Sequence, residues 1–276
     1  MPEKIGIIGL GLIGGSLAKA FEDAGLKIYG YDKSLDSISS AVECGIFEGL
    51  TDDMDEFLGF APDLIYIAVP VNTAVEILQE LGRKNVKTLI TDACSTKTTI
   101  CSEAGKLGLN FCGGHPIAGK EVSGFANSEA ELLKGALHIL TDGDETNVGF
   151  LKKLHEKIGM KVKVMDAEYH DEIFGVVSHF PHLISFALME LILKKDKNLL
   201  EYTGGGFKDF TRIAASDPVM WSDIFTDNSE HINNVIDEYI AILDDWKQQI
   251  NKKEKSVLMK KIRHVSSARQ CLYENI

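Results

Sequence analysis

Residues 4–14 have the sequence KIGIIGLGLIG, in which an apolar run is followed by glycines at positions 9, 11 and 14. The run Lys4–Leu10 is typical of a buried strand, and the spacing after it predicts a helix over Gly14–Ala24. In the pattern G-x-G-x-x-G, Gly9 permits a tight turn, Gly11 lets the backbone approach a pyrophosphate, and Gly14 lets the helix pack on the strand. Because N–H groups at the start of such a helix favour phosphate, this stretch predicts a dinucleotide site.

An acidic residue closes the second predicted strand, Lys27–Asp32. Asp32 lies about 20 residues beyond the glycines, where a carboxylate accepts hydrogen bonds from the ribose hydroxyls and repels a 2′-phosphate. We therefore expect NAD rather than NADP as the cofactor; the alternative is a glycine-rich turn without a ligand. The residues expected to bind NAD are Gly9, Gly11, Leu12, Ile13, Gly14 and Asp32.

The rest of the N-terminal half alternates strand-like and helix-like segments. Apolar runs predict further strands at Leu64–Pro70, Lys87–Ala93, Ala136–Thr141 and Lys161–Met165. Helical spacing lies between them over Asn72–Leu81, Thr98–Leu107 and Thr146–Ile158. Such alternation is typical of an α/β fold with a mainly parallel, doubly wound sheet, so we expect a Rossmann-type domain over residues 1–165.

Beyond about Asp166 the strand-like runs stop and helical periodicity takes over. An apolar stripe with steps of three and four is formed by Ile232, Val235, Ile236, Tyr239, Ile240, Leu243, Trp246 and Ile250. A helix with such a stripe buries it against other helices. We therefore expect an all-α second domain over residues 166–276.

Charge and composition exclude several classes of protein. The 276 residues carry a formal net charge of −12, which disfavours nucleic acid and anionic membranes as partners. The five cysteines form no CxxC pair, so neither a disulfide framework nor a zinc site is indicated. The apolar stretch Leu64–Val71 is too short to span a bilayer, and the N-terminus enters a strand without room for a signal peptide. We expect a soluble, cytoplasmic protein.

Two residues near predicted strand ends are candidates for catalysis, because ligands bind at the carboxyl ends of parallel strands. Ser95 follows the strand Lys87–Ala93; its alternative role is a helix N-cap. His115 follows two glycines, which permit close approach of a ligand, so we expect it not to be packed like a core residue. Near neutral pH a histidine can take a proton from a hydroxyl while hydride leaves the same carbon. The alternative for His115 is a surface loop.

Histidines also cluster just beyond the predicted domain boundary. His179 and His182 are three apart, so a helix would place them on one face. A zinc pair would need further ligands, and no cysteine or histidine has matching spacing. His170, which precedes Asp171, could simply begin a helix.

Lys208 and Arg212 are four apart, so a helix would align them on one side. Arginine can hold a carboxylate through two hydrogen bonds. The pair is therefore a candidate for the local positive charge that an acidic protein needs to bind an anionic substrate; the alternative is two surface cations.

Together these segments resemble the prephenate dehydrogenase family over essentially the whole chain. The resemblance rests on GLGLIGGS at 9–16, HPIAG at 115–119, SHFPH at 178–182 and GGGFKDFTRI at 204–213, in the family's order. It implies NAD-dependent oxidation of prephenate, with loss of carbon dioxide, to 4-hydroxyphenylpyruvate in tyrosine biosynthesis. It also implies that His115 deprotonates the ring hydroxyl and that Ser95 orients this histidine and touches the hydroxyl.

The resemblance implies roles for four more residues and for the assembly. Arg212 is expected to bind a substrate carboxylate, with His182 shaping that site, and Lys208 and Glu121 are expected to support or gate it as a pair. A homodimer through the C-terminal helices is implied. Many members of the family carry a C-terminal regulatory domain or a fused chorismate mutase; because the sequence ends at Ile276, soon after the helical region, we expect neither here. Tyrosine could inhibit by competing in the active site.

Three other functions stay open. Arogenate dehydrogenase would use the same residues, although Asp32 favours prephenate because many arogenate-specific relatives use NADP. A 3-hydroxyacid dehydrogenase would depend on a lysine such as Lys208 but would leave the segment at 115–119 unexplained. A non-catalytic NAD sensor would not need His115, Ser95 and Arg212.

Overall fold

The structure is a computed structural model that describes residues 2–141 and 143–274. The chain forms two compact units; the first ends at Ser229 and the second begins at Glu230. The expected fold class is confirmed: a doubly wound parallel sheet comes first, and helices follow.

The main sheet has six parallel strands in the order β3-β2-β1-β4-β5-β6. They are β1 (Lys4–Ile8), β2 (Lys27–Tyr31), β3 (Phe47–Thr51), β4 (Leu64–Ile67), β5 (Leu89–Asp92) and β6 (Phe111–Cys112). The order changes direction between β1 and β4, which pair in register from Ile5 and Leu64 onward. Ligands of open α/β sheets bind at such a switch point, outside the carboxyl ends of the strands.

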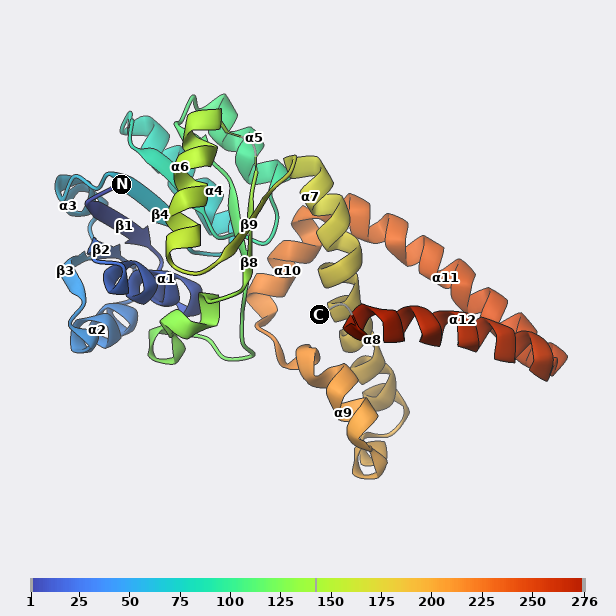
Figure 1. Ribbon diagram of the computed structural model, residues 1–276. Coiled ribbons are helices and arrows are strands. Elements are labelled where there is room, and N and C mark those ends of the chain that lie inside the picture. The colour runs from blue at the N-terminus through green and yellow to red at the C-terminus, as the bar shows by residue number, and fades with distance from the viewer. Residues whose placement is uncertain (1, 142, 275–276) are drawn as a thin grey trace. The chain divides into compact units, whose positions relative to one another are not determined.

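Helices cover both faces of this sheet (Figure 1). One face carries α1 (Leu12–Asp23), α2 (Leu35–Cys44) and α6 (Glu145–Lys157), and the other carries α3 (Met54–Gly59), α4 (Val71–Arg83) and α5 (Thr98–Lys106). Each layer buries its own apolar cluster, around Phe21 on the first face and Leu78 on the second. The predicted strands and helices of this part are confirmed to within a few residues.

A second, smaller sheet follows the first and differs from the expected plan. It contains β7 (Gly114–Ile117), β8 (Leu137–Leu140) and β9 (Lys161–Val164), with β7 antiparallel and β9 parallel to β8. Two 3-10 turns, Phe125–Asn127 and Ala130–Leu133, connect β7 to β8. The last two predicted strands thus belong to this sheet rather than to the doubly wound one.

From Ala167 to Glu274 the described secondary structure is helical. Asp166 caps the first helix, because its side chain accepts the N–H of Tyr169. The helices up to Ser229 are α7 (Ala167–Phe174), a π-helical turn (Gly175–His179), α8 (Phe180–Lys195), a 3-10 segment (Lys197–Tyr202), α9 (Gly205–Thr211), a 3-10 turn (Arg212–Ala215) and α10 (Pro218–Asp227).

The second unit is a helical hairpin formed by α11 (Ser229–Lys252) and α12 (Lys255–Glu274) (Figure 1). Lys261 joins the two helices by an ion pair with Asp245 and by a contact 4.7 Å from the ring centre of Trp246. Much of the predicted apolar stripe stays uncovered in the single chain, since Ile240 and Leu243 are about half exposed. An apolar face of this kind is typical of a contact with another protein chain.

One continuous helix, Ala167–Lys195, is long and apolar enough to span a membrane by length and composition, with a mean hydropathy of 1.6 over 18 residues. It is much longer than Leu64–Val71, the apolar stretch singled out from the sequence, because α7, the π turn and α8 join without a break. Length and composition alone are weak evidence that a single helix spans a membrane. The same helix carries His170, Asp171 and His179 as buried polar groups, which is not typical of a lipid-facing segment.

Candidate active site

The glycine-rich loop after β1 has the geometry of a dinucleotide site. Gly9 has a φ of +95°, and a side chain there would lie 2.5 Å from the carbonyl oxygen of Ala68. A side chain at Gly14 would collide with the carbonyl of Gly9, so this glycine is required for the packing of α1 on β1. At Gly11 a side chain would meet no protein atom within 4 Å, so contacts within the described chain do not require glycine there.

The start of α1 and the end of β2 complete this loop. Leu12 and Ile13 open α1, whose N-cap is Gly11 and which has no side-chain cap. Asp32 is held by two backbone N–H groups, from Leu10 at 2.7 Å and from Ser34 at 2.8 Å. These bonds leave lone pairs on both carboxylate oxygens, so the residues fit the phosphates and ribose of NAD.

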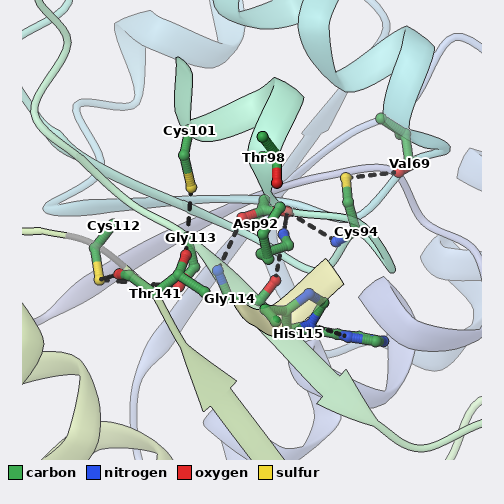
Figure 2. A network of polar contacts seen from close by, with 12 residues as sticks. Val69, Asp92, Cys94, Thr98, Cys101, Cys112, Gly113, Gly114, His115 and Thr141 are labelled. Atoms are coloured by element: carbon green, nitrogen blue, oxygen red, sulfur yellow. Dashed lines mark hydrogen bonds and ion pairs between the residues drawn. The ribbon is translucent and has the colours of Figure 1, made fainter. Parts of the chain in front are cut away.

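Asp92, at the carboxyl end of β5, organises the loops around the candidate base (Figure 2). Its buried carboxylate accepts the N–H of Gly114 and the N–H of Cys94, both at 2.9 Å, and it forms an ion pair with the fully buried Lys97. Lys97 Nζ also donates to the carbonyl of Gly114 at 2.8 Å. Burial alone would lower the pKa of Lys97, but Asp92 outweighs it and the pKa is raised. The backbone of Gly114, next to His115, is therefore held through its N–H by Asp92 at the end of β5 and through its carbonyl by Lys97 in the loop that follows.

His115 lies inside β7 and is only 9% exposed. The expectation that it is not packed like a core residue is wrong, and so is the alternative of a surface loop, because Gly114–Ile117 pairs with β8. Its ring lies 5.0 Å from the ring of Phe174. Burial lowers the pKa of His115 well below its ordinary value, and His170 and Lys97 lower it further. The imidazole is therefore neutral and can accept a proton.

A second histidine, on α7, holds the first. His115 Nδ1 lies 2.8 Å from His170 Nε2, and His170 Nδ1 lies 2.8 Å from Asp171 Oδ1. Sequence reasoning treated His170 as the start of a helix and missed this contact. The adjacent histidine and aspartate were visible, but nothing in their spacing pointed to a partner 55 residues away.

Ser95 lies in the loop between β5 and α5 and is partly exposed. The N-cap position of α5 is occupied by Lys97, so the alternative role of Ser95 as helix cap is wrong. Within residues 2–141 and 143–274, no hydrogen bond joins the Ser95 side chain to His115. The role expected for Ser95 stays a prediction.

His179 and His182 pack around Trp221, a residue of α10 that sequence reasoning did not single out. The ring of His182 stacks on Trp221 at 3.7 Å, and the ring of His179 meets it edge-on at 6.2 Å. His179 Nδ1 bonds Asn228, and a contact with the backbone of Ser95 partly offsets the effect of burial on the ring. Burial lowers the pKa of His179 to about 4. No group of metal-binding side chains occurs among the described residues.

The two predicted cations are separated by a change of helix type. Lys208 lies in α9 and is exposed, whereas Arg212 begins the 3-10 turn that follows. Arg212 forms an ion pair with Glu121. The expected pairing of Glu121 with Lys208 is therefore wrong, because the turn at Arg212 brings the guanidinium to the carboxylate.

Known proteins match both the sheet-containing part and the helical part of this chain. The family model described as "Prephenate dehydrogenase, nucleotide-binding domain" matches residues 17–164, and "Prephenate dehydrogenase, dimerization domain" matches residues 166–264. A prephenate dehydrogenase of Bacillus subtilis is 34% identical over 270 residues, which cover 92% of this chain and 72% of that protein.

Two solved structures are similar. Prephenate dehydrogenase from A. aeolicus, in complex with hydroxyphenyl propionate and NAD+, has a TM-score of 0.93 and 37% identity over 98% of both chains. Synechocystis arogenate dehydrogenase has a TM-score of 0.83 and 26% identity, over 98% of this chain and 99% of that one. The fold and these matches are those of an NAD-dependent dehydrogenase. The chain belongs to the prephenate dehydrogenase family.

Proposed function

We propose that this protein oxidises prephenate with NAD, releasing carbon dioxide and 4-hydroxyphenylpyruvate in tyrosine biosynthesis. The observation that carries the proposal is the buried, neutral imidazole of His115. It is tied through Gly114 to the carboxyl end of β5, the edge of the sheet at which the Gly9 loop also lies. A base and a hydride acceptor are thus brought to one edge, as the reaction requires.

The chemistry follows from the neutral base. NAD supplies the hydride acceptor when bound. His115 takes the proton of the ring hydroxyl as the carbon that bears this hydroxyl loses hydride. The bond between the ring and its carboxylate breaks, carbon dioxide leaves, and the electron pair of that bond completes the aromatic ring as a phenolate. The phenolate takes the proton back from His115, which gives 4-hydroxyphenylpyruvate and the neutral base. Because the imidazole starts uncharged, it gains a single positive charge when it takes the hydroxyl proton. Ser95, in the loop after β5, is proposed to contact the same hydroxyl.

The substrate is an anion, and we assign its carboxylate to Arg212. The guanidinium already holds one carboxylate, that of Glu121, which supports the assignment and makes Glu121 a competitor of the substrate. His182, stacked on Trp221, is proposed to shape this site, and Lys208 is proposed to add positive charge at its rim.

Arogenate is the second candidate substrate, since Synechocystis arogenate dehydrogenase shares the fold over nearly the whole chain. Measuring NADH or NADPH formation with prephenate and arogenate, each with NAD and NADP, decides between them. NADH formed with prephenate, together with 4-hydroxyphenylpyruvate, supports the proposal. Activity only with arogenate overturns the substrate; silence with both favours the hydroxyacid dehydrogenase or the NAD sensor.

The role of His115 has its own test. In His115→Ala we expect turnover to fall by at least about 100-fold, because a general base contributes roughly that much, while NAD affinity stays within about twofold. Undiminished turnover would remove His115 from the reaction.

We propose a cytoplasmic homodimer with domains over residues 1–165 and 166–276. The two family matches meet at the same place, and the second carries the description of a dimerization domain. Exposed apolar side chains on α8 and α11, such as Leu191 and Leu243, support a contact with a second copy. Sedimentation as a monomer at micromolar concentration would exclude the homodimer.

We also propose that tyrosine inhibits competitively, because it resembles the product. An unchanged KM for prephenate in the presence of tyrosine would exclude this inhibition.

A further inference from the structure

Asp171, His170 and His115 form a continuous line of hydrogen bonds from α7 to β7. Both histidine contacts are 2.8 Å long. Asp171 and His170 are 3% and 0% exposed, so water has little access to the line. Phe174 covers it, with its ring 4.4 Å from His170 and 5.0 Å from His115.

Asp171 is fixed as an acceptor. Besides His170, its carboxylate accepts the backbone N–H of Lys97 and of Thr98, both at 2.8 Å, at the N-terminus of α5. Burial alone would raise the pKa of Asp171, but the hydrogen bonds from His170 and Thr98 outweigh it and the pKa is lowered. The carboxylate is therefore ionised and donates nothing.

Counting donors then assigns every proton on the line. Because Asp171 only accepts, His170 must carry its hydrogen on Nδ1. Burial lowers the pKa of His170, so its ring is neutral and Nε2 has only a lone pair. His115 must therefore donate from Nδ1 to that lone pair, which leaves His115 Nε2 without hydrogen and able to receive one.

We propose that His170 and Asp171 are positioning residues that hold His115 in the Nε2-unprotonated tautomer and stabilise its cation when it takes the substrate proton. This inference rests on the proposed function for the identity of that proton. The same arrangement of carboxylate, histidine and reacting group orients the base of serine proteases. In this protein His170 lies between the carboxylate of Asp171 and the base, and the base is a second histidine, His115.

The other titratable groups around this pair are few. Lys97 and Asp92 lie on the β5–α5 side, and His179 lies on the α7–α8 side. His138 lies on β8, where burial lowers its pKa well below the usual value and leaves it uncharged near neutral pH. Lys97 is neutralised by Asp92, and His179 is uncharged near neutral pH since burial lowers its pKa to about 4. Asp171 thus supplies the one uncompensated charge that faces the two rings in the described part of the chain.

The test compares His170→Leu with His170→Gln. Leucine removes the acceptor for His115 Nδ1, so we expect kcat to fall about 100-fold with NAD affinity within twofold. The glutamine carbonyl can reach the position of Nε2 and accept that hydrogen, so we expect at least tenfold recovery over the leucine variant. His155→Leu is the matched control, because His155 is equally buried and bonds Tyr66 away from this line.

The nitrogen-15 spectrum of the histidine rings gives a second readout that needs no turnover. We expect His115 to carry hydrogen on Nδ1 in the native protein and in His170→Gln, and to lose this preference in His170→Leu. Hydrogen on Nε2 in the native protein overturns the proposal, as does full activity of His170→Leu or an equal loss in His155→Leu. If the leucine variant fails to fold, the native spectrum still decides. Failure of the proposed function would appear separately, as no turnover of prephenate by the native protein.

Discussion

Glu121 and Arg212 form an ion pair that joins the segment after β7 to the turn after α9. Both side chains are partly exposed, so the pair itself contributes little to stability, on the order of 0.2–1 kcal/mol. Its importance lies in competition, since the guanidinium that we assign to the substrate is already occupied.

Removing the competing carboxylate is expected to improve substrate binding. In the native protein the substrate must displace an ion pair worth about 1 kcal/mol or less before it binds Arg212. Glu121→Gln removes this competing ion pair, so KM for prephenate should fall by up to about fivefold. Arg212→Gln should raise KM by roughly 10- to 100-fold, because a charged hydrogen bond contributes about 1.5–3 kcal/mol. Steady-state kinetics of both variants check this.

The neighbouring pair Lys120–Glu129 offers the control for that experiment, since it is also partly exposed. Glu129→Gln should leave KM unchanged. If it lowers KM as much as Glu121→Gln does, the effect comes from general charge and the assignment of Arg212 is lost.

Asp32 is expected to determine the choice of dinucleotide. Asp32→Asn keeps an oxygen for the N–H of Leu10 but removes the charge that repels a 2′-phosphate. One charge at about 4 Å is worth roughly 1–4 kcal/mol between water and a protein surface, so the NAD-to-NADP ratio of kcat/KM should fall at least about fivefold. An unchanged ratio would show that Asp32 does not read the ribose.

The buried Lys97–Asp92 pair is expected to be indispensable for stability. Lys97→Met leaves the Asp92 charge buried and removes a donor to Gly114, so we expect a loss of about 3–5 kcal/mol in the free energy of unfolding. Urea unfolding measures it. The partly exposed pair Lys84–Asp55 is the reference, because Lys84→Met should cost less than about 1 kcal/mol. Equal losses would contradict the special role of burial.

Acid sensitivity is expected from two stacked histidines in the core. His138 and His155 are fully buried with rings 3.8 Å apart, and neither nitrogen of His138 has a partner among the described residues. Burial lowers the pKa of His138 well below its usual value and that of His155 to about 4. Since the unfolded chain binds protons first, stability is complete above about pH 6.5 and is lost as pH falls toward 4.

His138→Leu isolates half of this effect. When the pH falls from 7 to 5, one histidine that is protonated only in the unfolded chain lowers the free energy of unfolding by about 2 kcal/mol. His138→Leu lacks this histidine, so its free energy of unfolding should fall by about 2 kcal/mol less than that of the native protein over the same range. At pH 7 the variant should be at least as stable, because leucine buries no unpaired nitrogen. Equal acid losses in both proteins would show that His138 takes up its proton in the folded state.

The sequence predicted four of the six parallel strands, β1, β2, β4 and β5, because buried strands leave apolar runs between amphipathic helices. It predicted no strand at β3 or at the two-residue β6. It missed β7, since Gly114 and Pro116 are poor strand formers and only the pairing with β8 makes them a strand. His115 was therefore found by its chemistry but given the wrong surroundings.

The contacts of the site were harder to predict than its members. His170 meets His115, and Arg212 meets Glu121, only through the folded chain. Spacing along one helix shows which residues share a face, but it does not show which residue of another element lies opposite. Trp221 gave no signal at all, because an aromatic residue in a helical segment is usually core.

Asp171 accepts hydrogen bonds from the N–H groups at the start of α5. The residue before it, His170, bonds the proposed base, His115. The domain boundary that we propose at residue 165 therefore does not separate the groups of the reaction, since His170 and Asp171 lie beyond it and His115 lies before it. A chimera that took its first 165 residues from this chain and its helices from a distant dehydrogenase would inherit the dinucleotide loop and the base. It would work as a catalyst only if the donor of the helices supplied a histidine followed by an aspartate at the same place. Exchange of parts within this architecture is therefore limited by two adjacent side chains rather than by the fit of whole domains.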